Sequence, residues 1–150
     1  MSLSYNKTGL VDAVVRALSP LSVEGGGYLR LVEAYRGDPG GAGLLREAIQ
    51  LPAVFVSYAS SSYRPGPYLC TRETVSMNIF ALCRAGAAPD SGAVLADIRA
   101  LLAGSTLGLD VSPLRLLRES ALMETKETSV HAAVYSVEQT VKLDAQMAQG

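Results

Sequence analysis

The sequence is poor in the residues that bind metals or cross-link small domains. Among its 150 residues it has no tryptophan, a single histidine and two cysteines, Cys70 and Cys83. The cysteines form no CxxC pair and no second histidine accompanies His131, so the ligand spacings of zinc sites are absent. A chain of this length can bury enough surface to fold without a disulfide or a metal. We therefore predict two reduced thiols, with Cys83 on the buried face of a strand, and no metal site.

Motifs of catalysis and of nucleotide binding are also missing. The sequence has no P-loop, no HExxH pair and no GxSxG elbow. The run Gly25–Gly27 precedes an expected strand, so no helix N-terminus follows it to receive a phosphate. We predict that the chain is not an enzyme and takes no cofactor. The alternative is a small α+β enzyme or ligand-binding domain with a pocket around His131, which would need a carboxylate or thiol brought from elsewhere in the chain.

Charge is scarce in this chain. Charged residues make up 18% of the sequence, against about 25% in a typical domain, and the net charge is −1. This balance gives no electrostatic reason to bind nucleic acid. A low charge share leaves apolar surface that neighbouring subunits can cover. The basic residues are mainly arginine, which is enriched at protein interfaces, although a GC-rich coding genome produces the same bias.

Long apolar runs are lacking too. No stretch approaches the ~20 residues of a membrane-spanning helix. The N-terminal residues have neither the basic nor the apolar segment of a signal peptide. We expect the protein to be made in the cytoplasm and used there, or in a particle assembled there.

The strongest positive pattern is the alternation within Thr71–Arg84. One face of this segment is apolar and the other is mostly polar, with Phe80 and Leu82 as exceptions. The apolar face carries Val75, Met77, Ile79, Ala81 and Cys83. A period of two over this length predicts a strand with one buried face.

Further helices and strands are predicted on both sides of this strand. Apolar stripes predict helices at Thr8–Leu18, N-capped by Thr8, and at Ser91–Leu102, ended by Gly104. The remaining expected elements are a strand Tyr28–Tyr35 within the glycine-rich segment Glu24–Gly43, a short helix Leu44–Gln50, and strands Ala53–Ala59, Leu114–Glu124 and Ser129–Leu143, with a frayed tail from about Asp144. Consecutive strands joined by loops pair antiparallel. The predicted fold is α+β in a single domain over residues 1–150: one mostly antiparallel sheet with helices packed on one face.

The segment Ser60–Leu69 is the best candidate for an interaction site. It reads as a loop too long for a tight hairpin turn, and its prolines would stiffen it. Tyr63, Arg64 and Tyr68 within it are residue types that favour binding hot spots, and Arg72 follows just beyond. We predict that these four residues contribute to an interface. The alternative is a surface loop with incidental aromatic residues.

Three segments carry a resemblance to a known family. The small tail proteins of Mu-like phages have a strand that resembles Leu51–Tyr58 (LPAVFVSY). The second long strand of that family is similar to Val75–Cys83 (VSMNIFALC), and its helix resembles Leu95–Gly104 (LADIRALLAG). The segment from Leu114 resembles the closing hairpin, so the likeness covers about residues 8–143. The glycine-rich segment Glu24–Gly43 has no counterpart in that pattern.

The resemblance implies a tail terminator, similar in fold to that of long-tailed phages such as lambda. Such a subunit is expected to form a hexameric ring on the last ring of the tail tube, to stop tube growth and to offer a surface to the head connector. The implied partners are copies of itself, the tube protein and the connector protein, with no nucleic acid and no membrane. The implied location is the host cytoplasm during assembly and then the virion tail. A contractile bacteriocin-type device would use the same kind of subunit.

Overall fold

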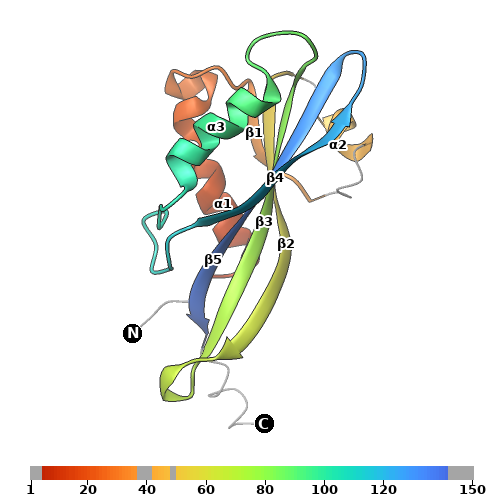
Figure 1. Ribbon diagram of the computed structural model, residues 1–150. Helices are drawn as coiled ribbons and strands as arrows, with labels where there is room; N and C mark the ends of the chain where they lie inside the picture. Colours follow the sequence, from red (N-terminus) through yellow and green to blue (C-terminus); the bar gives the residue numbers. More distant parts are fainter. Residues whose placement is uncertain (1–4, 37–41, 48–49, 142–150) are drawn as a thin grey trace.

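The computed structural model describes residues 5–36, 42–47 and 50–141 of the chain. Figure 1 shows a sheet of long strands with two helices beside its upper half. The elements follow one another as α1 (Lys7–Ala17), β1 (Leu31–Ala34), α2 (Ala42–Glu47), β2 (Ala53–Pro65), β3 (Thr71–Arg84), α3 (Ser91–Leu102), β4 (Arg115–Glu124) and β5 (Thr128–Val141). This order of helices and strands is the one that the sequence predicts.

Helix α1 forms where the apolar stripe predicts it, but its cap differs from the prediction. The Asn6 side chain, and not that of Thr8, caps the helix by accepting a hydrogen bond from the Gly9 N–H at 2.7 Å. The helix begins one residue before Thr8, which places Thr8 inside the first turn. Leu10, Val11 and Val14 are buried against the sheet.

The sheet has the order β1-β2-β3-β5-β4. Three of its pairings are antiparallel, whereas β1 runs parallel to β2 with Leu31 opposite Ala53. The α+β class predicted from the sequence is confirmed, and the sheet is mixed. The parallel pairing arises because the chain between β1 and β2 includes α2 and acts as a crossover rather than as a tight turn.

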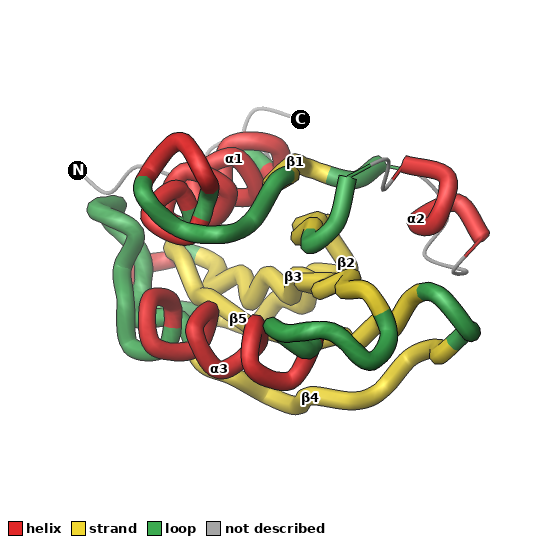
Figure 2. Tube along the Cα trace, turned by 90° about the horizontal axis from the view of Figure 1, so that it is seen from above, coloured by secondary structure: helices red, strands yellow, loops and turns green. Residues whose placement is uncertain are grey.

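Apolar side chains are buried on both faces of the sheet. The larger cluster lies under α1 and α3 and includes Val75, Met77 and Ile79. On the opposite face, Phe80 and Leu82 join Phe55 and Tyr35 in a second cluster, against which Leu45 of α2 packs. Figure 2 shows α1 and α3 on the same side of the sheet and α2 apart from them. Phe80 and Leu82 therefore interrupt the polar face of β3 because that face has a small core of its own.

Glycines 25 and 27 are explained by close backbone packing. A Cβ on Gly25 would collide with the Ser19 carbonyl, and one on Gly27 with the backbone of Leu21. The three-residue turn Ser19–Leu21 that follows α1 is held against this run by a 2.8 Å bond from the Tyr28 N–H to the Leu21 carbonyl. Gly37, Gly40 and Gly41 of the glycine-rich segment lie outside the described residues, as does the predicted tail from Asp144.

The second half of the chain follows the predicted boundaries closely. β3 and α3 have the predicted limits, Asp90 caps α3 through a 2.7 Å bond from the Ala93 N–H, and Gly104 follows the helix with a φ of +80°. β4 and β5 form the predicted hairpin, closed by a 2.8 Å bond from the Thr125 N–H to the Thr128 carbonyl. Within the described part of the chain, no helix is long and apolar enough to cross a membrane.

The loop predicted at Ser60–Leu69 is wrong over most of its length. β2 continues to Pro65 in register with β3, and only a short turn around Pro67–Leu69 joins the two strands. An irregularity between Tyr58 and Ser60 breaks the alternation of apolar residues, which made the strand look shorter in the sequence. The lower parts of β2, β3 and β5 extend beyond the helices (Figure 1). We call this projection, residues 60–76 and 137–141, the hairpin arm.

Candidate interaction surface

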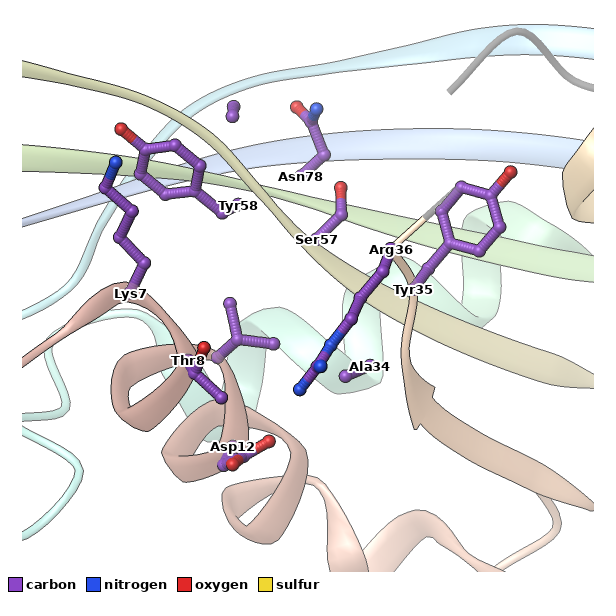
Figure 3. Close-up of a pocket in the computed structure, with 11 residues that line it drawn as sticks. Lys7, Thr8, Asp12, Ala34, Tyr35, Arg36, Ser57, Tyr58 and Asn78 are labelled. Atoms are coloured by element: carbon purple, nitrogen blue, oxygen red, sulfur yellow. The ribbon is translucent and has the colours of Figure 1, made fainter. Parts of the chain in front are cut away.

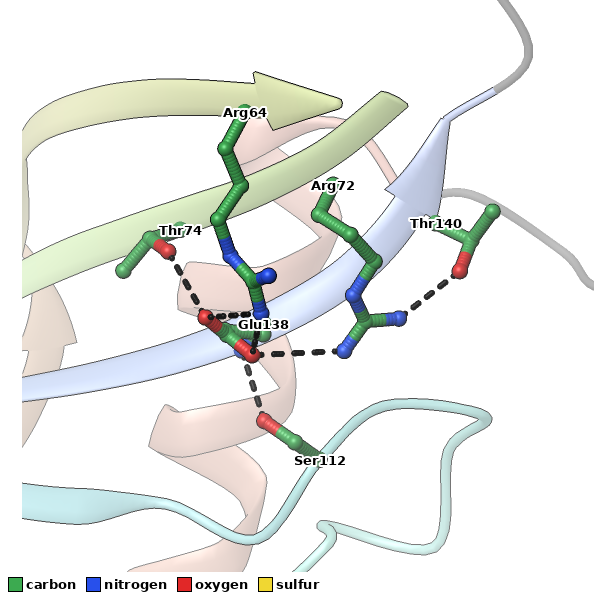
Figure 4. Close-up of polar contacts among 6 residues, drawn as sticks. All are labelled: Arg64, Arg72, Thr74, Ser112, Glu138 and Thr140. Atoms are coloured by element: carbon green, nitrogen blue, oxygen red, sulfur yellow. Dashed lines mark hydrogen bonds and ion pairs between the residues drawn. The ribbon is translucent and has the colours of Figure 1, made fainter. Parts of the chain in front are cut away.

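One face of the hairpin arm carries a cluster of charged and hydroxyl side chains (Figure 4). The Glu138 carboxylate on β5 lies 3.3 Å from a guanidinium nitrogen of Arg64 on β2 and 3.3 Å from one of Arg72 on β3. Hydrogen bonds from Thr74 Oγ1 to Glu138 at 3.2 Å, from Arg72 to Thr140 at 2.7 Å and from the Glu138 N–H to Ser112 Oγ at 2.8 Å complete the cluster. One carboxylate thus serves two guanidinium groups, and the cluster carries a net positive charge.

The two arginines control the ionisation of Glu138. Partial burial raises the pKa of the Glu138 carboxyl, but hydrogen bonds from Arg72 and Arg64 outweigh burial and hold the pKa below its ordinary value. The carboxylate is therefore charged at neutral pH and holds three strands of the arm together.

The opposite face of the arm holds a buried carboxylate. Glu73 on β3 accepts a 2.8 Å hydrogen bond from Gln139 Nε2 and a 2.9 Å bond from the Tyr63 hydroxyl. The Tyr63 bond to Glu73 raises the pKa of the Tyr63 hydroxyl. Gln139 also bonds the backbone of Tyr5 twice, through its Oε1 at 2.7 Å and its Nε2 at 2.8 Å. These bonds attach the segment before α1 to β5 within the arm.

The tip of the arm presents two large apolar side chains to solvent. Tyr68 is 97% exposed and Leu69 is 82% exposed. Both have a left-handed backbone conformation, with φ of 56° and 60°. Non-glycine residues adopt this conformation at a cost, and residues under such strain cluster at functional sites. The tip therefore exposes two large apolar side chains on a strained turn.

The structure brings together some of the predicted interface residues and separates others. Arg64 and Arg72 are cross-strand partners on one face, Tyr63 lies on the other face, and Tyr68 occupies the tip. Sequence reasoning missed Glu138, which lies more than 60 residues from either arginine. Only the register between β3 and β5 reveals that Glu138 lies beside Arg72.

A pocket of about 530 Å³ lies where β1 ends beside β2 (Figure 3). Lys7, Thr8, Val11 and Asp12 of α1 line one side, and the other lining residues are Ala34, Tyr35, Arg36, Ser57, Tyr58, Ala59 and Asn78. The Lys7 ammonium lies 4.5 Å from the centre of the Tyr58 ring, within the range of a cation–π contact. The pocket therefore combines two basic side chains, Lys7 and Arg36, and one acidic side chain, Asp12, with apolar lining residues.

His131 does not lie in this pocket. It is the fourth residue of β5, near the start of the strand, opposite Ala81 of β3 and Ala121 of β4. Its Nδ1 is buried and makes no hydrogen bond to any residue that the structure describes. Across the described ranges, no three His, Cys, Asp or Glu side chains gather into a group that could hold a metal ion.

Comparisons with known proteins find one matching family model and a solved structure of similar fold. The family model described as Bacteriophage Mu, Gp37 matches residues 9–143. A chain from a solved structure titled "Virion of native gene transfer agent (GTA) particle" shares the fold, with a TM-score of 0.61 and 19% sequence identity over 91% of this chain and 99% of that one. No curated protein matches the sequence.

Proposed function

The chain belongs to the family described as Bacteriophage Mu, Gp37, and from this premise we propose that it is a tail terminator of a phage or phage-like particle. The family and the fold shared with a virion chain support a structural protein of a phage-type tail rather than an enzyme. We assign the whole chain to one terminator-like domain. It assembles in the host cytoplasm and becomes part of the virion tail.

In this role, copies of the chain form a ring, most simply of six, on the last ring of the tail tube. The ring stops tube growth and offers its other side to the head connector protein. A closed ring uses two different faces of each subunit, and its two ends meet different partners. The two ends of this sheet differ accordingly. One carries the polar arm with its apolar tip, and the other carries the turn between β4 and β5.

The observation that carries this proposal, beside the family, is the exposed tip of the arm. Tyr68 and Leu69 expose large apolar side chains on a strained turn, while Arg64 and Arg72 present positive charge behind them. Apolar anchors flanked by arginine are typical of binding hot spots. We assign the tip, together with Tyr63, Arg64 and Arg72, to a contact with the tube or with a neighbouring copy.

The alternative of an enzyme or ligand-binding domain around His131 has less support. The side chain lies within a strand pattern flanked by alanines, and its Nδ1 meets no polar partner among the described residues. A general base must lie within hydrogen-bond reach of the proton that it removes, and His131 is not among the residues that line the pocket of Figure 3. The particle that contains the terminator is either a phage or a contractile bacteriocin-type device, since both need the same kind of subunit.

The test is to add the purified chain to tail tube protein during polymerisation. We expect shorter tubes with one capped end in electron micrographs, and a mean length that falls as the ratio of chain to tube protein rises. Light scattering over a range of concentrations shows whether a ring exists before tubes are present. Tubes of unchanged length and uncapped ends would refute the terminator role.

A further inference from the structure

One edge of the sheet is only partly covered. β1 pairs with β2 from Ala53 to Val56, and just beyond β1 the Tyr35 N–H donates a bond to the Val56 carbonyl at 2.8 Å. β2 then continues from Ser57 to Pro65 with β3 on one side, and no residue that the structure describes pairs with its other side. Open backbone groups on a sheet edge are a template for another strand.

The pocket of Figure 3 lies on the path that β1 would follow if it were longer. Lys7 and Val11 of α1 line it on one face of the sheet, and Tyr35 and Asn78 line it on the other. The pocket therefore wraps around the uncovered edge of β2 at Ser57–Ala59. A pocket open to both faces of a strand edge has the shape of a slot for an added strand.

At the opposite edge of the sheet, no described residue pairs with the outer side of β4. β4 is the terminal strand of the sheet, and most of its residues are exposed. Leu117 and Leu122 are 48% and 45% exposed, and each lies at an irregularity in the pairing with β5. Apolar side chains exposed on an edge strand favour contact with another chain.

We infer that β4 of one copy adds to the uncovered edge of β2, Ser57–Pro65, in the next copy, so that the sheets of a ring join edge to edge. This inference rests on the proposed ring. The two segments have similar length, and their strand directions allow them to pair. β4 runs antiparallel to β2 within one sheet, because three antiparallel pairings separate them. Rotation about an axis nearly parallel to the strands leaves the strand directions unchanged from copy to copy. β4 of one copy therefore lies antiparallel to β2 of the next copy.

The offset between the two edges fits a closed barrel. When the paired residues are followed from β4 across β5 and β3 to β2, Ser120 in the middle of β4 lies level with Phe55 of β2. The middle of the uncovered segment of β2 is Ser61. The difference is about five residues, or about 16 Å along the strands, over a width of about 19 Å for four strands. Joining the edges therefore tilts the strands by about 40°, within the 35–45° that closed barrels adopt.

Charge also agrees with this pairing. The antiparallel arrangement brings the β4–β5 turn of one copy, with Glu124, Lys126 and Glu127, to the pocket of the next. That pocket carries Lys7, Asp12 and Arg36. The turn thus bears a net negative charge and the pocket a net positive one.

Cysteine cross-linking between two variants tests the pairing directly. Ser62 on β2 and Ser120 on β4 are exposed and lie on the face of the sheet away from the helices. We would make Ser62→Cys and Ser120→Cys separately in a Cys70→Ser background, in which the remaining Cys83 is buried. The variants are treated with a short bismaleimide alone and mixed, with and without assembled tail tubes. Ser62→Cys mixed with Ala100→Cys on α3 is the matched control.

The expected result is a band at twice the monomer mass in the Ser62→Cys and Ser120→Cys mixture only. Dimers of Ser62→Cys alone would show that the β2 edge pairs with itself, which overturns β4 as the occupant. Rings or capped tubes without the mixed band would overturn the pairing and leave the terminator role standing. If the chain neither forms rings nor caps tubes, the terminator role fails and the pairing fails with it.

A second pair of variants does not depend on thiol reactivity. Leu122→Lys places a charge at the β4 edge, and Val23→Lys makes the same change at an exposed apolar residue outside β2 and β4. We expect Leu122→Lys to lose ring assembly with an unchanged melting temperature of the monomer, and Val23→Lys to keep assembly. Equal assembly of the two variants would overturn the inference.

Discussion

Arg64 on β2 is the cross-strand partner of Arg72 on β3, so two positive charges face each other on one side of the hairpin arm. Like charges directly opposite one another destabilise a sheet. Here the Glu138 carboxylate lies 3.3 Å from both guanidinium groups and compensates their repulsion. The stability of the arm therefore depends on a residue from a third strand.

Glu138→Gln removes the charge and keeps the size of the side chain. We expect the free energy of unfolding at pH 7 to fall by about 1 kcal/mol, because the cluster is partly exposed and such pairs contribute modestly. Urea denaturation measures the change. Glu33→Gln is the control, since Glu33 is exposed and makes no ion pair with any described residue. Equal effects of the two substitutions would show that the arginines need no shared carboxylate.

The contribution of Glu138 should depend on pH. Its folded-state pKa lies below the ordinary value, so its stabilisation is present above the unfolded pKa of about 4.3 and is lost as pH falls through the lower folded pKa. The difference in melting temperature between the wild type and Glu138→Gln should be constant above about pH 5.5 and should disappear at lower pH. A difference that stays constant down to about pH 2 would contradict the ion pairs.

Gln139→Leu should be the most destabilising change in the arm. Gln139 is buried, and its loss leaves Glu73 and the backbone of Tyr5 without their partners. We expect the free energy of unfolding to fall by about 3 kcal/mol, since each buried polar group left unpaired is costly. Thr140→Val, on the opposite face, removes one bond from Arg72 and should cost about 1 kcal/mol or less. If urea denaturation showed similar losses of unfolding free energy for Gln139→Leu and Thr140→Val, the result would contradict a stabilising role of the buried network around Gln139.

Tyr135→Phe should stabilise the protein. The Tyr135 hydroxyl is buried without a hydrogen-bond partner among the described residues, and burial raises its pKa to about 12. Removing an unpaired buried hydroxyl recovers its desolvation cost, so we expect a gain of about 1 kcal/mol. Tyr58→Phe is the contrast, because it removes a 2.8 Å bond to Ser61 and should give no gain. A loss of stability in Tyr135→Phe would indicate that the hydroxyl has a partner in solution.

Tyr68→Gly separates stability from function at the tip. Glycine relieves the left-handed strain at φ 56° but adds flexibility to the unfolded chain, so the free energy of unfolding should stay within about 1 kcal/mol. The same variant should lose most of its capping activity in the tube-length assay. Val23→Ala, which trims an exposed apolar side chain elsewhere, should keep both properties. Full capping activity of Tyr68→Gly would show that the Tyr68 side chain is not part of the interface.

Local patterns in the sequence were sufficient for several elements. The two-residue period of Thr71–Arg84 and the apolar stripe of Ser91–Leu102 yield the observed limits of β3 and α3, because burial of one face and helix capping act between near neighbours. The α+β class follows from the order of such elements. The cap at Asn6 was missed because Thr8 and Asn6 are both good N-caps and only the start of the helix decides between them.

Features that depend on pairing between distant segments required the tertiary structure. The true length of β2 is set by its register with β3, which continues through the irregularity near Ala59 that disguised the strand as a loop. The same register places Arg64 beside Arg72, and the pairing of β3 with β5 adds Glu138. Among the described residues, β2 has no neighbour on this edge beyond Val56 because β1 is short and pairs in parallel only with Ala53–Val56. Sequence periodicity records which face of a strand is buried, whereas its neighbours and its open edges are decided by which strands lie next to it.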